Sequence, residues 1–133
     1  LSPVYASPRD DNGYDISDYR TIAPEFGTLE DFDRLVAEAK ARDIRIVMDL
    51  VVNHCSKEHA WFKAASTSQD APEYDLFIWR DPADDGGPPD ATMACFGGSA
   101  WTYVPAIGKY YFGFFSPSQP DFNWQNPALR REI

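Results

Sequence analysis

The stretch IRIVMDLVVNH, residues 44–54, decides the fold. Past Arg45 it is apolar on both faces except at Asp49, a pattern typical of a parallel strand covered on both sides. A buried carboxylate is costly unless it has a partner, so we expect Asp49 to be paired. Asn53 and His54 follow as soon as the apolar run stops, and this places two polar side chains at the end of the predicted strand, residues 44–52.

The residues before this strand predict a helix and an earlier strand. Thr28 is the expected N-cap of a helix over residues 29–42, with Asp31 in a capping-box position. Its apolar residues recur at the helical spacing i, i+3, i+4, i+7: Phe32, Leu35, Val36 and Ala39. Residues 1–4 resemble the end of a strand. Together these segments predict a β-α-β unit, and therefore an α/β fold with a parallel sheet.

The residues after the strand predict a smaller unit with mixed structure. Ser56 is the expected cap of a short helix, and residues 74–79 are expected to form a strand. The aromatic stretches at 101–104 and 109–115 predict a hairpin joined through residues 105–108. Asn126 followed by Pro127 is typical of a helix start.

Composition excludes several classes of function. With 44% hydrophobic and 15% aromatic residues, the chain has too much core material to be disordered. A net charge of −9 argues against binding to nucleic acid, and no apolar run reaches the ~18 residues of a membrane span. At 133 residues it is at most one domain, and its first residues suggest a piece of a longer chain.

The chain has two cysteines, Cys55 and Cys95. Two thiols in an acidic, enzyme-like sequence are more typical of a reducing compartment than of a disulfide framework, so we expect both thiols to be free and the protein to be cytoplasmic.

Three stretches in this order resemble one family. SPVYASPRDDNGYDISDY (2–19), MDLVVNH (48–54) and QPDFNW (119–124) are similar to motifs of the α-amylase superfamily of glycoside hydrolases, in its oligo-1,6-glucosidase and α-glucosidase branch. FGGSAW (96–101) and HAWF (59–62) support the same branch. The resemblance implies a partial (β/α)8 TIM barrel in residues 1–54, an inserted α+β B domain in residues 55–118, and a return to the barrel in residues 119–133.

The resemblance also implies roles for individual residues. His54 would hydrogen-bond a hydroxyl of the sugar before the scissile bond, and Tyr14 would stack under that ring. Asp11 would accept hydrogen bonds from terminal glucose hydroxyls, and Phe96 would wall the pocket. Structural support would come from four further residues: Asp49, Asn53, Gln119 and Asp121. In the family, the partner of Asp49 is an arginine on the next barrel strand, beyond residue 133.

The family's catalytic carboxylates are not among these residues. Its aspartate nucleophile, its glutamate acid/base and a third aspartate follow later strands, so the 133 residues alone are predicted to be inactive. No metal or cofactor is expected, since His54, Cys55 and His59 fit no closed zinc set and the family's calcium loop is missing. One departure from the branch is PDATMAC (89–95), where an Asn-Asn-Trp-like stretch is usual.

The resulting prediction is a retaining α-glucosidase that acts on short α-linked gluco-oligosaccharides, with a small-molecule oligosaccharide as its partner. A sucrose isomerase or transglucosidase of the same family, a non-catalytic glucosidase-like protein and a carbohydrate-binding module remain as alternatives. From the residues alone, His54 could equally be a structural histidine, Asp11 a turn aspartate, and Tyr14 and Phe96 packed aromatic side chains.

Overall fold

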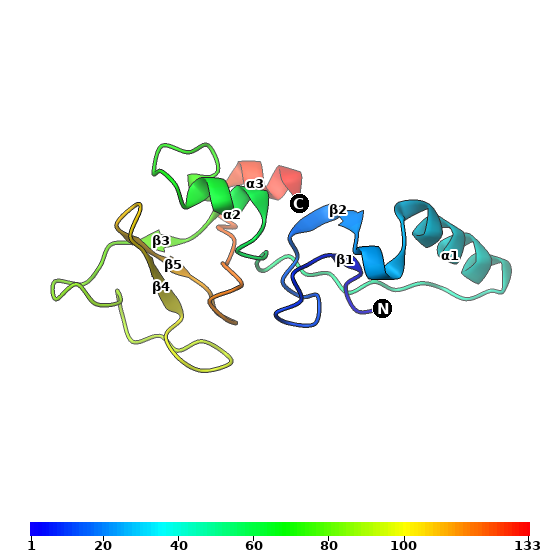
Figure 1. Cartoon of the computed structure of the whole chain (residues 1–133), viewed down its shortest axis with the longest axis horizontal. Helices are drawn as coiled ribbons and strands as arrows, with labels where there is room; N and C mark the ends of the chain where they lie inside the picture. The colour runs from blue at the N-terminus through cyan, green and yellow to red at the C-terminus, as the bar shows by residue number, and fades with distance from the viewer.

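The computed structural model describes all residues, 1–133, as an elongated molecule with two parts (Figure 1). Helix α1 (Leu29–Ala41) and the short strands β1 (Tyr5–Ala6) and β2 (Asp18–Ile22) lie at one end. A three-stranded sheet lies at the other end, with helices α2 (Ala60–Ala65) and α3 (Pro127–Glu132) beside it. An extended segment after α1 joins the two parts.

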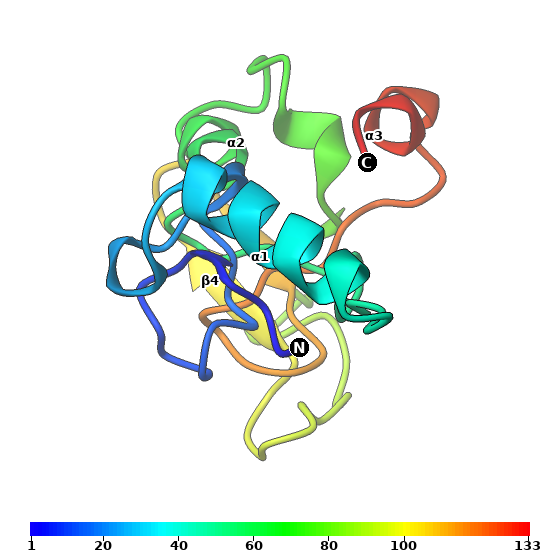
Figure 2. The ribbon, with the colours of Figure 1, turned by 90° about the vertical axis from the view of Figure 1, so that its right-hand side faces the viewer.

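Helix α1 starts as its sequence predicts and ends one residue before the predicted position. The Thr28 hydroxyl accepts a hydrogen bond from the Asp31 amide at 3.2 Å, and the Asp31 carboxylate accepts one from the Thr28 amide at 2.9 Å, so the capping box is confirmed. Its predicted apolar face is mostly uncovered: Ala39 is buried, but Leu35 and Val36 are exposed. Figure 2 shows α1 on the near side of the molecule.

The predicted strand at residues 44–52 belongs to no sheet in this structure. None of its apolar side chains is buried. Ile44, Val47 and Leu50 are exposed by 56%, 74% and 80%, and the other four are partly buried. The expectation that Asp49 is buried is wrong for this chain, because neither face of the segment is fully covered. One pair of hydrogen bonds has the parallel pattern: the Leu1 amino group donates to the Val47 carbonyl, and the Asp49 amide donates to the Leu1 carbonyl.

The sequence suggested the end of a strand at residues 1–4. In the structure these residues are not a strand, and β1 follows directly after them. β1 pairs antiparallel with β2, with Tyr5 opposite Ile22 and Ala6 opposite Asp18. The polar loop between the two strands reverses the direction of the chain. After β2, a 3₁₀ turn, η1 (Pro24–Phe26), precedes α1. All named strand pairs in the chain are antiparallel.

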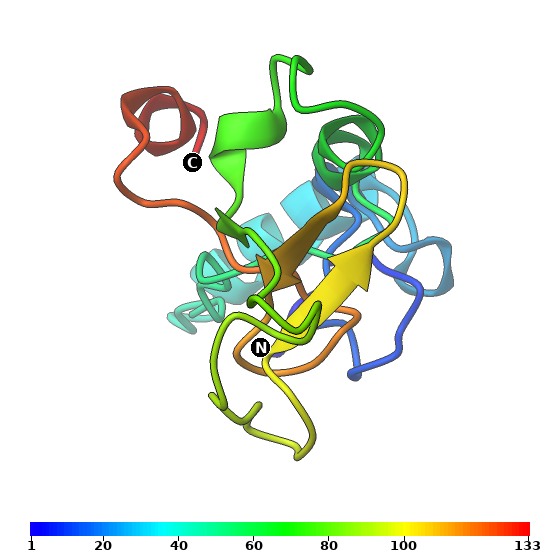
Figure 3. The ribbon, with the colours of Figure 1, turned by 90° about the vertical axis from the view of Figure 1, so that its left-hand side faces the viewer.

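The second sheet contains the predicted aromatic hairpin (Figure 3). β4 (Trp101–Val104) and β5 (Lys109–Phe112) pair antiparallel across the turn at 105–108, and β3 (Trp79–Arg80) adds to the other edge of β5. β5 ends at Phe112 and not at residue 115, since the chain turns sharply after Gly113, where a Cβ atom would lie 2.7 Å from the Ser116 carbonyl oxygen. Half of the strand predicted at 74–79 is a 3₁₀ turn, η2 (Tyr74–Leu76), and only Trp79 of that range belongs to β3.

Of the two helix N-caps predicted in this part, one is confirmed and one is wrong. Asn126 caps α3 through its side chain, as expected. The cap of α2 is His59 and not Ser56, because the His59 Nδ1 atom accepts the Trp61 amide hydrogen bond at 3.1 Å. Ser56 is buried and instead accepts from the Glu58 amide.

The hydrophobic core lies between α2, α3 and the second sheet. Its ten buried members are Cys55, Phe62, Ala65, Leu76, Phe77, Trp79, Ile107, Tyr111, Phe122 and Leu129. Phe62 is at the centre, stacked on Trp79 and edge-on to Phe77 and Tyr111. Cys55 and Cys95 are both free, as predicted. None of the helices is both long enough and apolar enough to span a membrane.

Candidate functional site

A tight loop before β2 carries two of the predicted sugar-binding residues, Asp11 and Tyr14. It is held by Asp15, which is fully buried. The Asp15 carboxylate accepts hydrogen bonds from the Ser7 hydroxyl and from the amides of Asp10 and Asp11, at 2.9–3.0 Å. Sequence reasoning missed Asp15, although an acid directly before a buried isoleucine in a turn-rich loop could have indicated a residue that bonds to its own loop.

His54 lies below this loop and is almost fully buried. Its Nε2 atom is 3.1 Å from the Tyr14 carbonyl oxygen, which can only accept, so Nε2 carries the hydrogen in this arrangement. Nδ1 then accepts from the Asn53 amide group at 3.3 Å. Burial lowers the pKa of His54, which keeps the ring neutral at pH 7. The ring also meets Phe115 edge-on, with 5.1 Å between ring centroids.

Asp49 has a partner in this chain, and that partner is a tyrosine. The Tyr14 hydroxyl donates to Asp49 Oδ2 at 2.8 Å. This hydrogen bond, together with the negative charge of the carboxylate, raises the pKa of Tyr14. No arginine or lysine of the chain forms an ion pair with Asp49, and its family role toward an arginine remains a prediction.

Gln119 and Asp121 lie behind the loop and are both buried. The Gln119 side-chain amide donates to Asp11 Oδ2 at 2.9 Å. Asp121 pairs with His54 in an isolated antiparallel bridge, and its carboxylate accepts from the Phe114 amide at 3.0 Å. Residues 119–121 thus contact both the loop and the histidine, and their supporting role remains a prediction.

The predicted sugar-binding residues meet at one hollow of about 370 Å³. Asp11, Tyr14 and His54 line it, and Phe96, although 66% exposed, forms part of its rim. The predicted supporting residues Asp49 and Asn53 line it as well, together with three residues of the extended segment and Phe115: Leu50, Val51, Val52 and Phe115. Phe115 was not predicted as a site residue, since the sequence placed it in a hairpin core.

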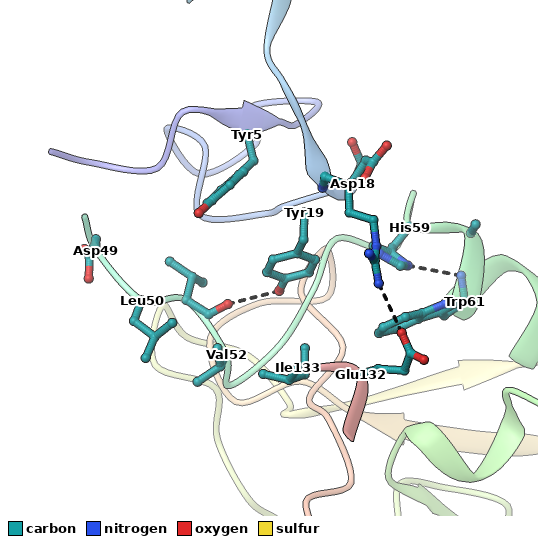
Figure 4. A pocket seen from close by; sticks show the side chains of 14 residues that line it. Tyr5, Asp18, Tyr19, Asp49, Leu50, Val52, His59, Trp61, Glu132 and Ile133 are labelled. Atoms are coloured by element: carbon teal, nitrogen blue, oxygen red, sulfur yellow. Dashed lines mark hydrogen bonds and ion pairs between the residues drawn. The ribbon is translucent and has the colours of Figure 1, made fainter. Parts of the chain in front are cut away.

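A second hollow, of about 530 Å³, is lined by the same residues 49–52 of the extended segment and by side chains of β2 and α2 (Figure 4). Tyr19, His59 and Trp61 line it, and an ion pair between Arg20 and Glu132 crosses it at 3.3 Å. The Tyr19 hydroxyl donates to the carbonyls of residues 51 and 54, which ties the segment to β2. Among the predicted site residues, only Asp49 borders this hollow. No group of three or more His, Cys, Asp or Glu side chains is arranged to hold a metal ion.

The buried Asp121 carboxyl makes chain stability depend on pH. Burial raises its pKa from 3.8 to about 6, so the folded chain binds this proton more tightly than the unfolded chain. The stability that this group contributes is present below pH 4 and is lost as the pH rises through 6. Relative to Asp121→Asn, the unfolding free energy of the wild type should fall by roughly 2–3 kcal/mol between pH 4 and pH 7.

Urea unfolding of the wild type and Asp121→Asn at both pH values, followed by circular dichroism, measures this difference. Parallel pH profiles for the two proteins would contradict it.

The whole chain, residues 1–133, matches the family described as "Alpha amylase, catalytic domain". The chain belongs to the alpha-amylase family. Palatinase of Erwinia rhapontici is 61% identical to it, and glucan 1,6-alpha-glucosidase of Streptococcus pneumoniae serotype 4 is 59% identical. Both similarities cover 100% of this chain but only 24% of the relative, so the chain spans about a quarter of the length of these proteins.

Solved structures of alpha-amylase-family enzymes have the same fold over this region. The trehalose-6-phosphate hydrolase of Bacillus licheniformis matches 99% of the chain and 24% of its own, with a TM-score of 0.97 and 47% identity. A mutant of the trehalulose synthase MutB, in complex with sucrose, matches 98% of the chain and 23% of its own, with a TM-score of 0.95 and 51% identity. This alpha-amylase-family chain, with its mixed helix and sheet content, therefore matches part of the TIM-barrel glycoside hydrolases.

Proposed function

We propose that the chain is the glucose-binding part of a retaining α-glucosidase that hydrolyses short α-linked gluco-oligosaccharides. The observation that carries this proposal is the hollow in which Asp11, Tyr14 and His54 meet. An aromatic ring beside a carboxylate and a neutral imidazole suits a sugar, which has apolar CH faces and a rim of hydroxyls. The names of the similar proteins, a palatinase and 1,6-glucosidases among them, support a glucosidase.

In this proposal each residue has one task. Tyr14 stacks under the glucose ring, Asp11 accepts hydrogen bonds from its terminal hydroxyls, and Phe96 closes the rim. His54 donates from Nε2 to a sugar hydroxyl. Because that N–H already points at the Tyr14 carbonyl at 3.1 Å, the hydroxyl must share it or displace the carbonyl.

Four further residues support the sugar-binding side chains. Asp49 and Asn53 do so at the edge of the hollow, and Gln119 and Asp121 from outside it. For Asp49 we propose that the arginine of the next barrel strand joins or replaces its Tyr14 contact. Asn53 fixes the His54 ring through Nδ1. The substrate is the only partner that we propose, without nucleic acid or membrane, and the two free cysteines support a cytoplasmic location.

We also propose a division of the chain into parts of a (β/α)8 barrel. Residues 1–54 would supply two strands and the helix between them, residues 55–118 an inserted B domain, and residues 119–133 the return to the barrel. Eight of the ten core residues lie within residues 55–118, which supports the inserted domain. The uncovered apolar faces of residues 44–52 and of α1 suit elements that pack inside a larger barrel.

Catalysis requires carboxylates outside these residues. A retaining enzyme needs its nucleophile and its acid/base about 5–5.5 Å apart, and in this family both follow later strands. We therefore expect hydrolysis only from the full-length protein, the whole polypeptide to which these residues belong. The 133 residues alone should show none.

A sucrose isomerase is the second candidate, and the similarity to trehalulose synthase MutB favours it. Both candidates can be tested on the full-length protein by proton NMR of its first products. A retaining α-glucosidase should release glucose from isomaltose as the α-anomer and should leave a β-glucoside intact. Release of the β-anomer or no turnover would contradict the proposal, and conversion of sucrose to an isomeric disaccharide would favour the second candidate.

A further inference from the structure

A chain of directed hydrogen bonds runs behind Asp11, the residue proposed to accept the sugar hydroxyls. The Ser118 hydroxyl is 2.8 Å from the Ser116 hydroxyl, and Ser116 donates to Gln119 Oε1 at 3.0 Å. Gln119 Nε2 then donates to Asp11 Oδ2 at 2.9 Å. Gln119 is fully buried, and the bond spans 108 positions of the sequence, from the segment after β5 to the loop before β2.

The Gln119 amide has one favoured orientation among these hydrogen bonds. A flipped amide would bring its oxygen against the Asp11 carboxylate, which can only accept, and the two oxygens would repel. The Ser116 hydroxyl can donate or accept, so the Asp11 carboxylate is what turns the NH2 group toward itself, while Ser116 holds the other end of the amide.

Within residues 1–133, Asp11 has no other partner for its side chain. It forms no ion pair with any lysine or arginine of these residues, and Gln119 is its one side-chain hydrogen bond. That bond engages Oδ2 and leaves Oδ1 without a partner among these residues. The Asp11 backbone is fixed separately, by the Asp15 carboxylate, so Gln119 restrains the rotation of the carboxylate itself.

We propose that Gln119, anchored at Oε1 by Ser116, is a positioning residue that holds the Asp11 carboxylate so that Oδ1 accepts a substrate hydroxyl. This inference rests on the proposed function, because it assigns the purpose of the contact to sugar binding. A carboxylate that is already held in its binding orientation loses less side-chain freedom when the substrate binds. The effect should therefore appear mainly in KM.

A double-mutant cycle in the full-length protein tests this proposal with p-nitrophenyl-α-glucoside as the probe. Gln119→Leu should raise KM about tenfold or more, as expected for the loss of a hydrogen bond to a charged group. Asp11→Ala should raise KM further. Since Gln119 acts through Asp11, the double variant should have the KM of Asp11→Ala alone. Independent effects that multiply in the double variant would overturn the proposal.

Two further variants keep the test meaningful if Gln119→Leu folds poorly. Ser116→Ala removes only the hydroxyl that anchors Gln119 Oε1, and it should raise KM about threefold to tenfold in the wild type but not in the Asp11→Ala background. Gln125→Leu changes an exposed glutamine nearby and should leave kinetics unchanged. A Ser116→Ala effect that persists without Asp11 would also overturn the proposal.

The contact can be measured even if the protein is not a glucosidase. With selective ¹⁵N-glutamine labelling of the full-length protein, the Gln119 side-chain NH2 resonance should shift in Asp11→Ala, while that of Gln125 should not. If the resonance shifts but the protein has no glucosidase activity, the contact between Gln119 and Asp11 is confirmed and the proposed function is contradicted. An unchanged Gln119 resonance would overturn the positioning role whatever the activity.

Discussion

Replacing His54 by alanine in the full-length protein is expected to lower kcat/KM for p-nitrophenyl-α-glucoside about 100-fold or more. The reason is that His54 is proposed to donate its Nε2 hydrogen to the sugar beside the scissile bond, and removal of one such donor typically costs 10²–10³ in rate. The imidazole is already oriented by Asn53 and held neutral by burial, so little of its contribution depends on rearrangement. Initial rates at several substrate concentrations measure the effect.

Lys57→Ala is the matched control for this variant, since Lys57 is exposed and only three positions away. It should keep wild-type kinetics. Circular dichroism must show that His54→Ala is folded, because His54 is buried and its loss leaves a cavity. A folded His54→Ala protein with nearly wild-type kcat/KM would mean that His54 is a structural histidine and does not bind the sugar.

Replacing Tyr14 by alanine or by phenylalanine should separate its two contacts. Tyr14→Ala removes the aromatic platform, and we expect kcat/KM to fall about tenfold to 100-fold, given that stacking on aromatic side chains contributes on the order of 1–3 kcal/mol. Tyr14→Phe keeps the ring and removes only the hydroxyl bond to Asp49, so its loss should stay within about threefold. Steady-state kinetics of both variants measure this difference.

Equal losses for the two Tyr14 variants would contradict the platform role. They would indicate that the hydroxyl bond to Asp49, and not the ring, is what the site requires.

Local signals in the sequence were sufficient for several elements. The capping box at Thr28, the cap at Asn126 and the hairpin turn after Val104 depend on residues within a few positions of one another, and all three are present in the structure. The strand predicted at 44–52 failed for the opposite reason. A strand needs the backbone of a neighbouring strand to donate and accept its hydrogen bonds, and within these residues only the backbone of Leu1 does so.

Some residues of the candidate site could likewise be predicted from the sequence, and others could not. Asp11, Tyr14 and His54 could be named from motifs, and the structure places them around one hollow. Phe115 was missed because its contact with His54 joins distant parts of the sequence. Asp15 was missed although its hydrogen bonds stay within its own loop. The partner of Gln119 lies 108 positions away, so only the folded chain reveals which residue its amide holds.

The central claim is that the hollow between Asp11, Tyr14 and His54 binds glucose. A crystal structure of the full-length protein soaked with α-D-glucose tests it most directly. We predict the sugar ring over Tyr14, with hydroxyls within hydrogen-bond distance, about 2.5–3.2 Å, of the Asp11 carboxylate and His54 Nε2. Glucose bound in the hollow beside Tyr19, His59 and Trp61, or absent from the Asp11 hollow at a concentration that inhibits the enzyme, would contradict the claim.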